Sequence, residues 1–416
     1  MRILHVVPSY IPAYRYGGPI RSVHGLCKGL AGRGHEVHVF TTNVDGDKDS
    51  KVLLEQPVDL DGVKVRYFPS KHLRRIYYAP SLGRALNREI KNFDLVHLHS
   101  IFLWPTWAAA RTARRENIPY IVTPRGMLVK ELIRRKSRFW KTVWINLIEK
   151  RNLENAAVIH MTSRIEANDI AQFGFNLNRV RIVPNGVDMP KGFKFSPPLR
   201  GGDEGEGKGL EFSQDRFADV SPHVREVIEK GPYLLFLGRV NWKKGLDRLI
   251  LAMKQISDGR LIIAGNDEED YRPGIERLVS ENGLEGRVVF YGPVYDVDKF
   301  ALLKSARVFV LPSYSENFGL SVLEAMACGC PVVVTPEVGV AEIVRDSGAG
   351  VVINGDPVEL GKGIKHLLSD SNQLKDMSER GKKTVAERFT WDVVSKQMEE
   401  VYRAFARTDH TNYPDV

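Results

Sequence analysis

The stretch that most constrains the fold is residues 308–335, where a short apolar run, a polar turn, a helical pattern and a second apolar run follow one another. Residues 308–311 predict a buried strand, and the β-branched residues 332–335 predict another. Between them, the polar turn 312–317 leads into a helix that we expect to begin near Phe318. This order predicts a strand–helix–strand unit of a parallel sheet. Its loop lies at the sheet edge where open α/β folds bind ligands.

The helix in this stretch has recognisable ends. Ser315 and Asn317 are candidate N-caps, because their side-chain oxygens can accept hydrogen bonds from free amides of the first turn. Gly329 and Pro331 end the helix, since glycine favours the C-terminal capping position and proline cannot continue a helix. The loop before the helix is therefore short and polar.

Two glutamates flank the expected helix start, Glu316 in the loop and Glu324 about two turns further along. The backbone amides of Phe318, Gly319 and Leu320 have no acceptor inside a helix that starts here, and they lie at the positive end of its dipole. Such a helix start binds phosphate readily. The element therefore offers amides to a diphosphate and carboxylates to hydroxyl groups on either side, which matches the layout of a nucleotide sugar.

The segment ENFGLSVLE, from Glu316 to Glu324, resembles the E-x7-E motif of the family 4 retaining glycosyltransferases, also described as glycosyl transferases group 1, which have the GT-B fold. The resemblance implies that Glu316 holds hydroxyl groups of the donor sugar and that Glu324 holds the ribose. It also implies that Asn317 and the amides after it lie at the donor. The spacing of two glutamates is equally typical of a solvated helix face, so the other motifs must decide between the two interpretations.

A second motif lies at the start of the C-terminal half. Residues 233–240, YLLFLGRV, open the second domain with a buried strand, and the segment from Gly238 to Gly245 matches the family signature GR(L/V)-x-x-x-KG. Arg239 follows the strand and Lys244 opens the expected helix, so both cations can meet one point above the sheet edge. The resemblance assigns them to the departing diphosphate, whose growing negative charge they stabilise. It also places the backbone around Val294 at the nucleotide base.

Strand-like runs alternate with helical patterns through the first half, which predicts a doubly wound parallel sheet there as well. The first connection has Gly17 and Gly18 just before a helix. It lacks the G-x-G-x-x-G fingerprint, so we do not expect a nicotinamide cofactor. A simple turn is one interpretation of this glycine pair. The resemblance implies the other, in which the glycine loop faces the phosphates of the donor.

Two further segments of the first half point to an acceptor. His97 and His99 lie on one face of an expected strand, with His99 at its end, and a metal site would need ligands that the sequence does not identify. Arg125, in the segment TPRGML, stands where many relatives have histidine, and a guanidinium suits a phosphate or carboxylate better than proton transfer. The resemblance therefore assigns His99 and Arg125 to the acceptor. The TPRGML form is similar to relatives of polysaccharide and lipopolysaccharide assembly.

Length and composition predict the domain organisation. The chain has 416 residues, of which 43% are apolar, so we expect two domains with substantial cores. Residues 191–230 are rich in glycine and proline and predict a linker or surface insertion. It separates an acceptor-binding domain, residues 1–190, from a nucleotide-sugar domain, residues 231–390. The resemblance implies that the last segment, residues 391–416, forms a helix that returns to the first domain.

Charge and cysteine content exclude several classes of protein. The net charge of +9 suits a phosphate-bearing substrate, and the three cysteines form neither a disulfide framework nor a zinc motif. No nucleic-acid motif accompanies the charge. We see no signal peptide and no apolar run of roughly 18–20 residues, so we expect a cytoplasmic protein. Basic and apolar residues alternate between Lys130 and Arg151, which is typical of a helix on an anionic membrane or of a surface helix packed on the core.

These motifs occur in the family's order along almost the whole chain. They predict two Rossmann-like domains of the GT-B fold and a retaining transferase. It moves a hexose from a UDP- or GDP-linked donor to a hydroxyl group of a glycan or lipid-linked acceptor, without a metal or other cofactor. Two alternatives remain open, a nucleotide-sugar epimerase of the same fold and a non-catalytic sugar- or membrane-binding protein. The sequence leaves the sugar, the base, the linkage and the acceptor undetermined.

Overall fold

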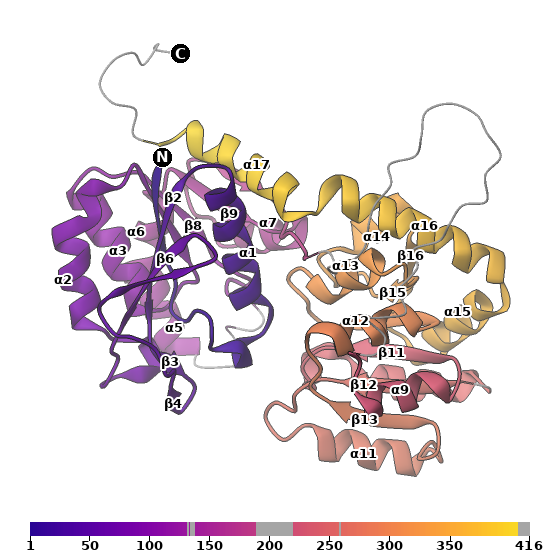
Figure 1. Ribbon diagram of the computed structural model, residues 1–416. Coiled ribbons are helices and arrows are strands. Elements are labelled where there is room, and N and C mark those ends of the chain that lie inside the picture. Colours follow the sequence, from indigo (N-terminus) through magenta and orange to yellow (C-terminus); the bar gives the residue numbers. More distant parts are fainter. Residues whose placement is uncertain (131–132, 134–137, 189–218, 258, 407–416) are drawn as a thin grey trace, which may run out of the picture. The chain divides into compact units, whose positions relative to one another are not determined.

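The computed structural model describes residues 1–130, 133, 138–188, 219–257 and 259–406. The chain divides into two compact units. The first comprises Met1–Gly186 and Trp391–Val416, and the second comprises Val187–Thr390. Figure 1 shows a sheet with helices on both of its faces in each unit. The predicted α/β class with two Rossmann-like domains is confirmed.

The first unit is built on a largely parallel sheet. Its strands are β1 (Arg2–Val6), β2 (Glu36–Thr42), β3 (Val44–Asp45), β4 (Lys48–Asp49), β5 (Pro57–Leu60), β6 (Val63–Phe68), β7 (Leu95–His99), β8 (Tyr120–Thr123), β9 (Val158–Met161) and β10 (Val180–Ile182). The main sheet has the order β10-β9-β8-β7-β1-β2-β6-β5, and β3 and β4 form a separate ribbon. Only the pair β5 and β6 of the main sheet is antiparallel.

Helices cover both faces of this sheet. They are η1 (Tyr14–Tyr16), α1 (Gly18–Gly32), η2 (Arg74–Ile76), α2 (Pro80–Glu89), η3 (Ile90–Asn92), α3 (Trp104–Arg115), α5 (Arg138–Trp144), the π-helical turn η4 (Ile145–Glu149), α6 (Lys150–Glu154), α7 (Arg164–Ala171) and α17 (Trp391–Arg403). Neighbouring residues of β1 enter different core clusters, Ile3 with α1 and α17, and Leu4 with α2 and α3. Because helices cover both faces, the central strands β1 and β7 are almost fully buried, whereas β6, next to the edge strand β5, alternates between buried and more exposed residues.

The second unit has a fully parallel sheet. Its strands are β11 (Tyr233–Leu237), β12 (Arg260–Ala264), β13 (Val288–Gly292), β14 (Val308–Leu311), β15 (Val332–Val334) and β16 (Gly350–Val352), in the order β13-β12-β11-β14-β15-β16. Its helices are α9 (Pro222–Glu229), η5 (Trp242–Lys244), α10 (Leu246–Ala252), η6 (Met253–Gln255), α11 (Arg272–Glu281), α12 (Asp296–Ser305), α13 (Leu320–Ala327), α14 (Ala341–Ser347), α15 (Pro357–Ser369) and α16 (Ser371–Arg388). The strand order reverses beside β11, which makes this position a topological switch point.

The predicted linker, residues 191–230, is wrong at its C-terminal end. Residues 189–218 lie outside the described part of the chain. The remainder includes α9, whose Val224 and Val227 are buried in the core of the second unit. The apolar spacing of this short helix was hidden by the glycine-rich composition that precedes it.

The basic segment between Lys130 and Arg151 is described only in part. Within it, Ile133 and Ile145 are buried in the core of the first unit, whereas Leu147 is 73% exposed. Its apolar side chains are therefore divided between the core and the surface. Among the described residues, no helix combines the length and the apolar character that crossing a bilayer requires.

Helix α17 packs against α1 within the first unit, and glycines make the close approach possible. A Cβ atom on Gly25 would lie 2.1 Å from Cε2 of Trp391, and one on Gly186 would lie 2.6 Å from Cε3 of the same ring. A Cβ atom on Gly29 would lie 2.9 Å from the side chain of Ser395. The indole ring therefore occupies space that any other residue at Gly25 or Gly186 would need.

This packing predicts that Gly25→Ala destabilises the first unit by about 1–3 kcal/mol, because the added methyl group overlaps the Trp391 ring. Helix propensity alone predicts the opposite sign, a gain of about 1 kcal/mol. Gly32→Ala on the same helix is the control, since a Cβ atom there meets nothing within 4 Å. Urea unfolding of both variants measures the difference, and equal stability of the two would contradict the packing.

Candidate functional site

The predicted donor residues of the second unit follow two neighbouring strands. Strand β11 lies between β12 and β14, so the connections that leave β11 and β14 diverge at the carboxyl edge of the sheet. The loop after β11 carries Arg239 and Lys244, and the loop after β14 carries Glu316. Topology thus brings together side chains that lie far apart in the sequence.

Lys244 and Glu316 form an ion pair between Nζ and Oε2, with side chains that are only 13% and 19% exposed. The backbone of Glu316 is fixed by the neighbouring loop, because its N–H donates to the carbonyl of Glu337 at 3.1 Å and its carbonyl accepts from Gly339 at 2.9 Å. Lys244 lies in the 3-10 turn η5 and not at the start of α10, as the sequence suggested. The turn lies closer to the strand end than a helix start would.

The ionisation state of Glu316 depends on its burial and on the charged and polar groups around it. Burial alone would raise the pKa of its carboxyl group. Lys244, Arg239 and a hydrogen bond from the backbone N–H of Phe318 outweigh burial and hold the pKa below its ordinary value. The carboxylate of Glu316 is therefore ionised at neutral pH. It can accept hydrogen bonds from hydroxyl groups but has no proton to donate.

Arg239 contributes to the same cluster from a more exposed position. Its guanidinium donates to Oε1 of Glu268 at 2.7 Å, and the two side chains are 46% and 39% exposed. Asn241 also donates to Glu268, at 2.5 Å. The sequence marks Glu268 only by its place in the polar loop after β12 and does not predict its pairing with Arg239. Because water solvates this ion pair, an anionic ligand can replace Glu268 as the partner of Arg239 at a small cost in free energy.

The start of helix α13 differs from the prediction. The helix begins at Leu320, and its N-cap is Gly319 at φ 99° with no side-chain cap, so neither Ser315 nor Asn317 caps it. Glycine is needed here for its positive φ, and a Cβ atom would lie 2.9 Å from Val338. The Phe318 ring is 4% exposed. Phe318 therefore presents only its backbone to the loop.

Glu324 has a buried cation as its partner. Nζ of Lys299 lies 2.7 Å from Oε1 of Glu324, and the side chains are 7% and 12% exposed. Sequence analysis missed Lys299. The signal was present, because Lys299 precedes Leu302 and Leu303 by one helical turn and so shares their buried face. Val294, the residue predicted at the base, lies between β13 and α12 and is 9% exposed.

The glycine pair of the first unit lies at the start of α1. Gly17 is the N-cap at φ 73°, a conformation that favours glycine, and Gly18 is the first helical residue. A Cβ atom on either residue would meet nothing within 4 Å. The carboxyl edge of β1 is therefore open at this point, while the proposed contact with phosphate stays a prediction.

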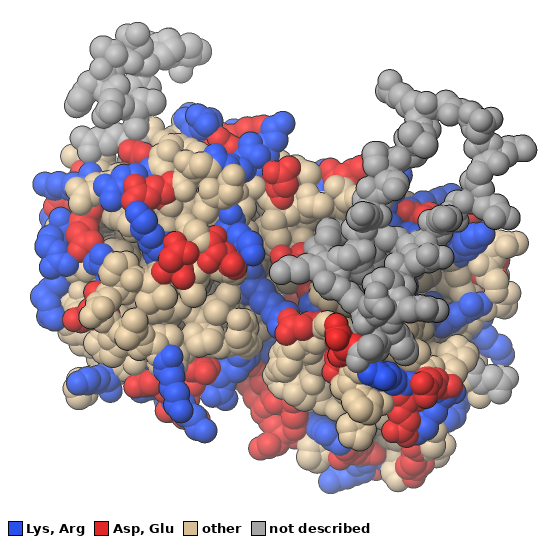
Figure 2. All heavy atoms as spheres, in the orientation of Figure 1, with Lys and Arg blue, Asp and Glu red and all other residues tan. Residues whose placement is uncertain are grey.

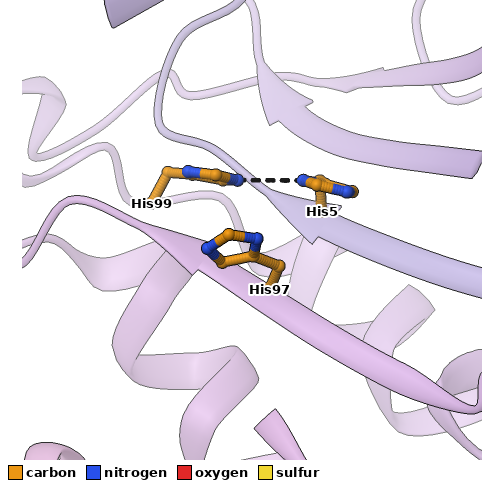
Figure 3. A group of neighbouring side chains, drawn as sticks. All are labelled: His5, His97 and His99. Atoms are coloured by element: carbon orange, nitrogen blue, oxygen red, sulfur yellow. Dashed lines mark hydrogen bonds between the residues drawn. The ribbon is translucent and has the colours of Figure 1, made fainter. Parts of the chain in front are cut away.

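Histidines gather at the centre of the first unit's sheet. Figure 3 shows His5, His97 and His99 with their rings close together, and their nearest ligand atoms all lie within 4.8 Å of one another. All three are buried, at 0%, 0% and 1% exposure. The spacing alone would suit a metal ion, but the hydrogen bonds support a different interpretation.

One chain of hydrogen bonds begins at Arg125. Its guanidinium has only donors, and it donates to Nδ1 of His99 at 3.1 Å. Nε2 of His99 must then carry the proton, and it donates to Nδ1 of His5 at 2.9 Å. The arginine thus fixes the tautomer of both rings. It also leaves the Nε2 proton of His5 without a partner among the described residues.

A second chain ends at a backbone carbonyl. His160 donates from Nε2 to the carbonyl of Val183 at 2.8 Å, so its Nδ1 accepts from the Thr123 hydroxyl at 2.9 Å. Thr123 in turn accepts from Nε2 of His97 at 2.7 Å. Nδ1 of His97 then accepts from the Tyr402 hydroxyl at 2.5 Å. The chain therefore joins α17 to three adjacent strands in one direction.

These two chains account for both ring nitrogens of His97 and of His99. A metal ion would have to displace hydrogen bonds that are already satisfied, so we interpret the cluster as a neutral network. The predicted contact of His99 with an acceptor is corrected accordingly, because this ring is 1% exposed and engaged on both sides. His99 positions Arg125 instead.

Arg125 is the half-buried end of the network. It also donates to Asn185 at 2.8 Å and to Ser22 at 3.2 Å, while its Nε has no partner among the described residues. Burial lowers its pKa to about 10, which still leaves it a cation at neutral pH. An unsatisfied donor on a fixed cation is suited to an anionic or hydroxyl-rich ligand.

The histidines predict a pH dependence of stability. Burial lowers the pKa of His5 and His160 to about 3, and it lowers those of His97 and His99 well below the ordinary value of 6.5. The unfolded chain takes up protons near pH 6.5 while the folded chain does not, so stability falls as pH decreases below that value. Each histidine contributes up to about 1.4 kcal/mol per pH unit.

Urea unfolding between pH 7.5 and 5.5 measures this effect. His160→Gln should reduce the slope by about one proton, whereas His72→Gln, at an exposed position of the same unit, should leave it unchanged. A free energy of unfolding that stays constant over this range would show that the network is not neutral.

Comparisons with known proteins identify the family of this chain. The chain matches the family described as Glycosyl transferases group 1 over residues 221–384 and the family described as Glycosyltransferase Family 4 over residues 16–190. It is 28% identical to the uncharacterized glycosyltransferase MJ1607 of Methanocaldococcus jannaschii, over 97% of this chain and 98% of that protein. It is 27% identical to a D-inositol 3-phosphate glycosyltransferase of Xylanimonas cellulosilytica, over 93% of this chain and 91% of that protein.

Solved structures share the fold. Anabaena Alr3699/HepE in complex with UDP-glucose matches with a TM-score of 0.72 and 22% identity, over 97% of this chain and 100% of that one. Sucrose-phosphate synthase of Thermosynechococcus elongatus matches with a TM-score of 0.71 and 23% identity, over 97% of this chain and 99% of that one. This chain therefore belongs to the group 1 glycosyltransferases and has their GT-B fold.

Proposed function

We propose that this chain is a retaining glycosyltransferase that moves a hexose from a UDP- or GDP-linked donor to a hydroxyl group of a glycan or lipid-linked acceptor. The observation that carries the proposal is the ion pair of Lys244 and Glu316 at the carboxyl edge of β11 and β14. It lies within the region that matches Glycosyl transferases group 1. In this proposal Glu316, Arg239 and Lys244 are the catalytic residues.

The donor would separate this ion pair. The diphosphate oxygens form ion pairs with Lys244 and Arg239. Glu316 then accepts hydrogen bonds from hydroxyl groups of the sugar. The bond from the anomeric carbon to the phosphate breaks, and a bond to the acceptor oxygen forms on the same face. The acceptor's proton passes to the leaving phosphate oxygen, so the reaction needs no protein base. The two cations stabilise the charge that develops on the diphosphate.

The remaining donor contacts follow the same logic. Glu324 accepts from the ribose hydroxyl groups, held in place by Lys299. The backbone of residues 317–320, at the start of α13, faces the donor, and the backbone around Val294 contacts the base. The assignment of Gly17 and Gly18 to the donor phosphates is part of the same proposal.

Arg125 is the proposed acceptor residue. Its free Nε and its fixed guanidinium fit an acceptor with a phosphate or carboxylate, such as those of polysaccharide or lipopolysaccharide assembly. The relative from Xylanimonas cellulosilytica is named for a phosphorylated compound, D-inositol 3-phosphate. That name supports an anionic acceptor as the first class to test.

The first test of this proposal is an acceptor-dependent assay with UDP- and GDP-sugars. Glu316→Gln keeps the shape of the side chain but removes its charge, and we expect a loss of at least about 100-fold in kcat/KM. Lys244→Met should cause a similar loss. Glu337→Gln, in the adjacent loop, and Lys254→Met are matched controls and should retain activity, since both side chains are exposed.

The products of this assay separate the alternatives. A retaining transferase releases nucleoside diphosphate only with an acceptor, and the new linkage keeps the donor's anomeric configuration. An epimerase would instead yield an isomeric nucleotide sugar without acceptor. Full turnover by a folded Glu316→Gln protein would refute the assigned site.

The pair of Lys299 and Glu324 gives a separate prediction. Lys299→Met leaves a nearly buried carboxylate without a partner, which should cost about 3–5 kcal/mol of stability. The double variant Lys299→Met/Glu324→Gln removes both charges and should recover most of that loss. It should not recover the KM for the donor, because the neutral amide of glutamine accepts hydrogen bonds from the ribose more weakly than the carboxylate does. Stability and KM that change together in both variants would contradict the proposed role of Glu324.

A further inference from the structure

A large basic pocket lies in the first unit, away from the residues considered so far. Its volume is about 1090 Å³, and Arg111, Arg114, Arg115 and Arg151 line it without any acidic side chain among the lining residues. By contrast, basic and acidic side chains are interspersed over the visible face of each unit (Figure 2). A concave site with one sign of charge selects anions.

The pocket lies at the opposite sheet edge from Arg125. Its lining includes Tyr120, the first residue of β8, and Ala157, the residue just before β9. Strands β7, β8, β9 and β10 are parallel, so these residues mark the amino edge of the sheet. Arg125 follows the carboxyl end of β8. A ligand in the pocket would therefore not compete with the proposed acceptor.

One wall of the pocket is a single face of α3. Trp107 precedes Arg111 by four residues, and Arg111 precedes Arg114 and Arg115 by three and four, so all four lie on one side of the helix and line the pocket. The other face of α3 is rich in alanine and is buried in the core. The core packing of α3 therefore fixes the direction in which the three arginines project.

Two of these arginines have structural partners. Arg114 donates to Asn152 at 2.7 Å and to the Tyr120 hydroxyl at 3.2 Å, and Arg115 pairs with Glu116 at 2.8 Å. Both lie in the last turn of α3, where cations complement the helix dipole. Their presence is explained without a ligand.

Arg111 and Arg151 are both exposed, and no ion pair in the described part of the chain holds either guanidinium. They lie on different walls, Arg111 one turn before the end of α3 and Arg151 on α6. Among the described residues neither has a carboxylate within ion-pair distance, and the Arg111 guanidinium lies over the Trp107 ring, 5.7 Å from its centre. Two unpaired guanidinium groups in one acid-free pocket match the oxygens of a phosphate, which accept from several donors at once.

The pocket also has an apolar side. Trp107, Ile148, Phe405 and Leu147 contribute to its lining, and Leu147 is 73% exposed. An exposed leucine beside arginines is typical of a site whose ligand combines an anionic group with apolar surface.

We propose that this pocket binds the phosphate group of an amphiphilic ligand, with Arg111 and Arg151 as the phosphate-binding residues and the apolar side chains against the rest of the ligand. A membrane phospholipid and a soluble organic phosphate share this chemistry. The proposal does not depend on the proposed glycosyl transfer, because the pocket and the catalytic residues lie on different elements.

The test measures binding of the full chain to two probes. The first is vesicles of phosphatidylglycerol in phosphatidylcholine, compared with phosphatidylcholine alone. The second is dihexanoyl phosphatidic acid below its micelle concentration, a soluble phosphate with short acyl chains. Arg111→Gln and Arg151→Gln should each weaken binding about tenfold or more. Arg84→Gln, an exposed arginine of α2 outside the pocket, is the charge-matched control and should change binding little.

Each outcome decides the proposal. Loss of vesicle binding in both pocket variants, with the control unchanged, supports the site with a membrane lipid as the source. Loss of the soluble probe alone supports a free phosphate. Absence of binding to both probes, or an equal loss in the Arg84 control, overturns the proposal. Transferase activity of the pocket variants in solution should equal that of the wild type, which separates this site from the catalytic one.

Discussion

The chemistry proposed for this protein depends on the ion pair of Lys244 and Glu316. Both side chains are largely withdrawn from water, so each charge needs the other while no donor is present. A donor can separate them only by supplying replacements, phosphate oxygens for the lysine and hydroxyl groups for the glutamate. A nucleotide sugar supplies both at once. A ligand with only one of these groups would leave a nearly buried charge without a partner, so the pair selects for the complete donor.

The parallel sheet makes this pair possible. Strand β11 adjoins β14, and their carboxyl ends meet at the switch point, so two loops from distant parts of the chain reach one place. Burial makes this closeness matter for the charge of Glu316. Its carboxyl group stays ionised only because two cations and one backbone amide stabilise the charged form. In the first unit, hydrogen bonds to neighbouring residues fix the position of a half-buried cation in the same way. Arg125 is held by His99, and its cationic donors fix the tautomers of the rings behind it.

The sequence was sufficient for the fold class and for the location of Glu316, Arg239 and Lys244, because strand periodicity and short motifs are local signals. It did not predict the partners of these residues. Lys299 and Glu268 are defined by contacts between separate elements, which no spacing within one element reveals. The start of α13 was misplaced for a related reason. Ser315 and Asn317 are good N-caps by propensity, but the contact with Val338 requires glycine at position 319.

The most direct test of the account compares the affinities of nucleoside diphosphate and nucleotide sugar for the wild type and for Glu316→Gln by calorimetry. If Glu316 competes with the diphosphate for Lys244 and also holds the sugar, the two affinities must change in opposite directions. We expect the variant to bind the nucleoside diphosphate at least as tightly as the wild type and the nucleotide sugar at least about tenfold more weakly. Equal changes in both affinities, or none in either, would contradict it.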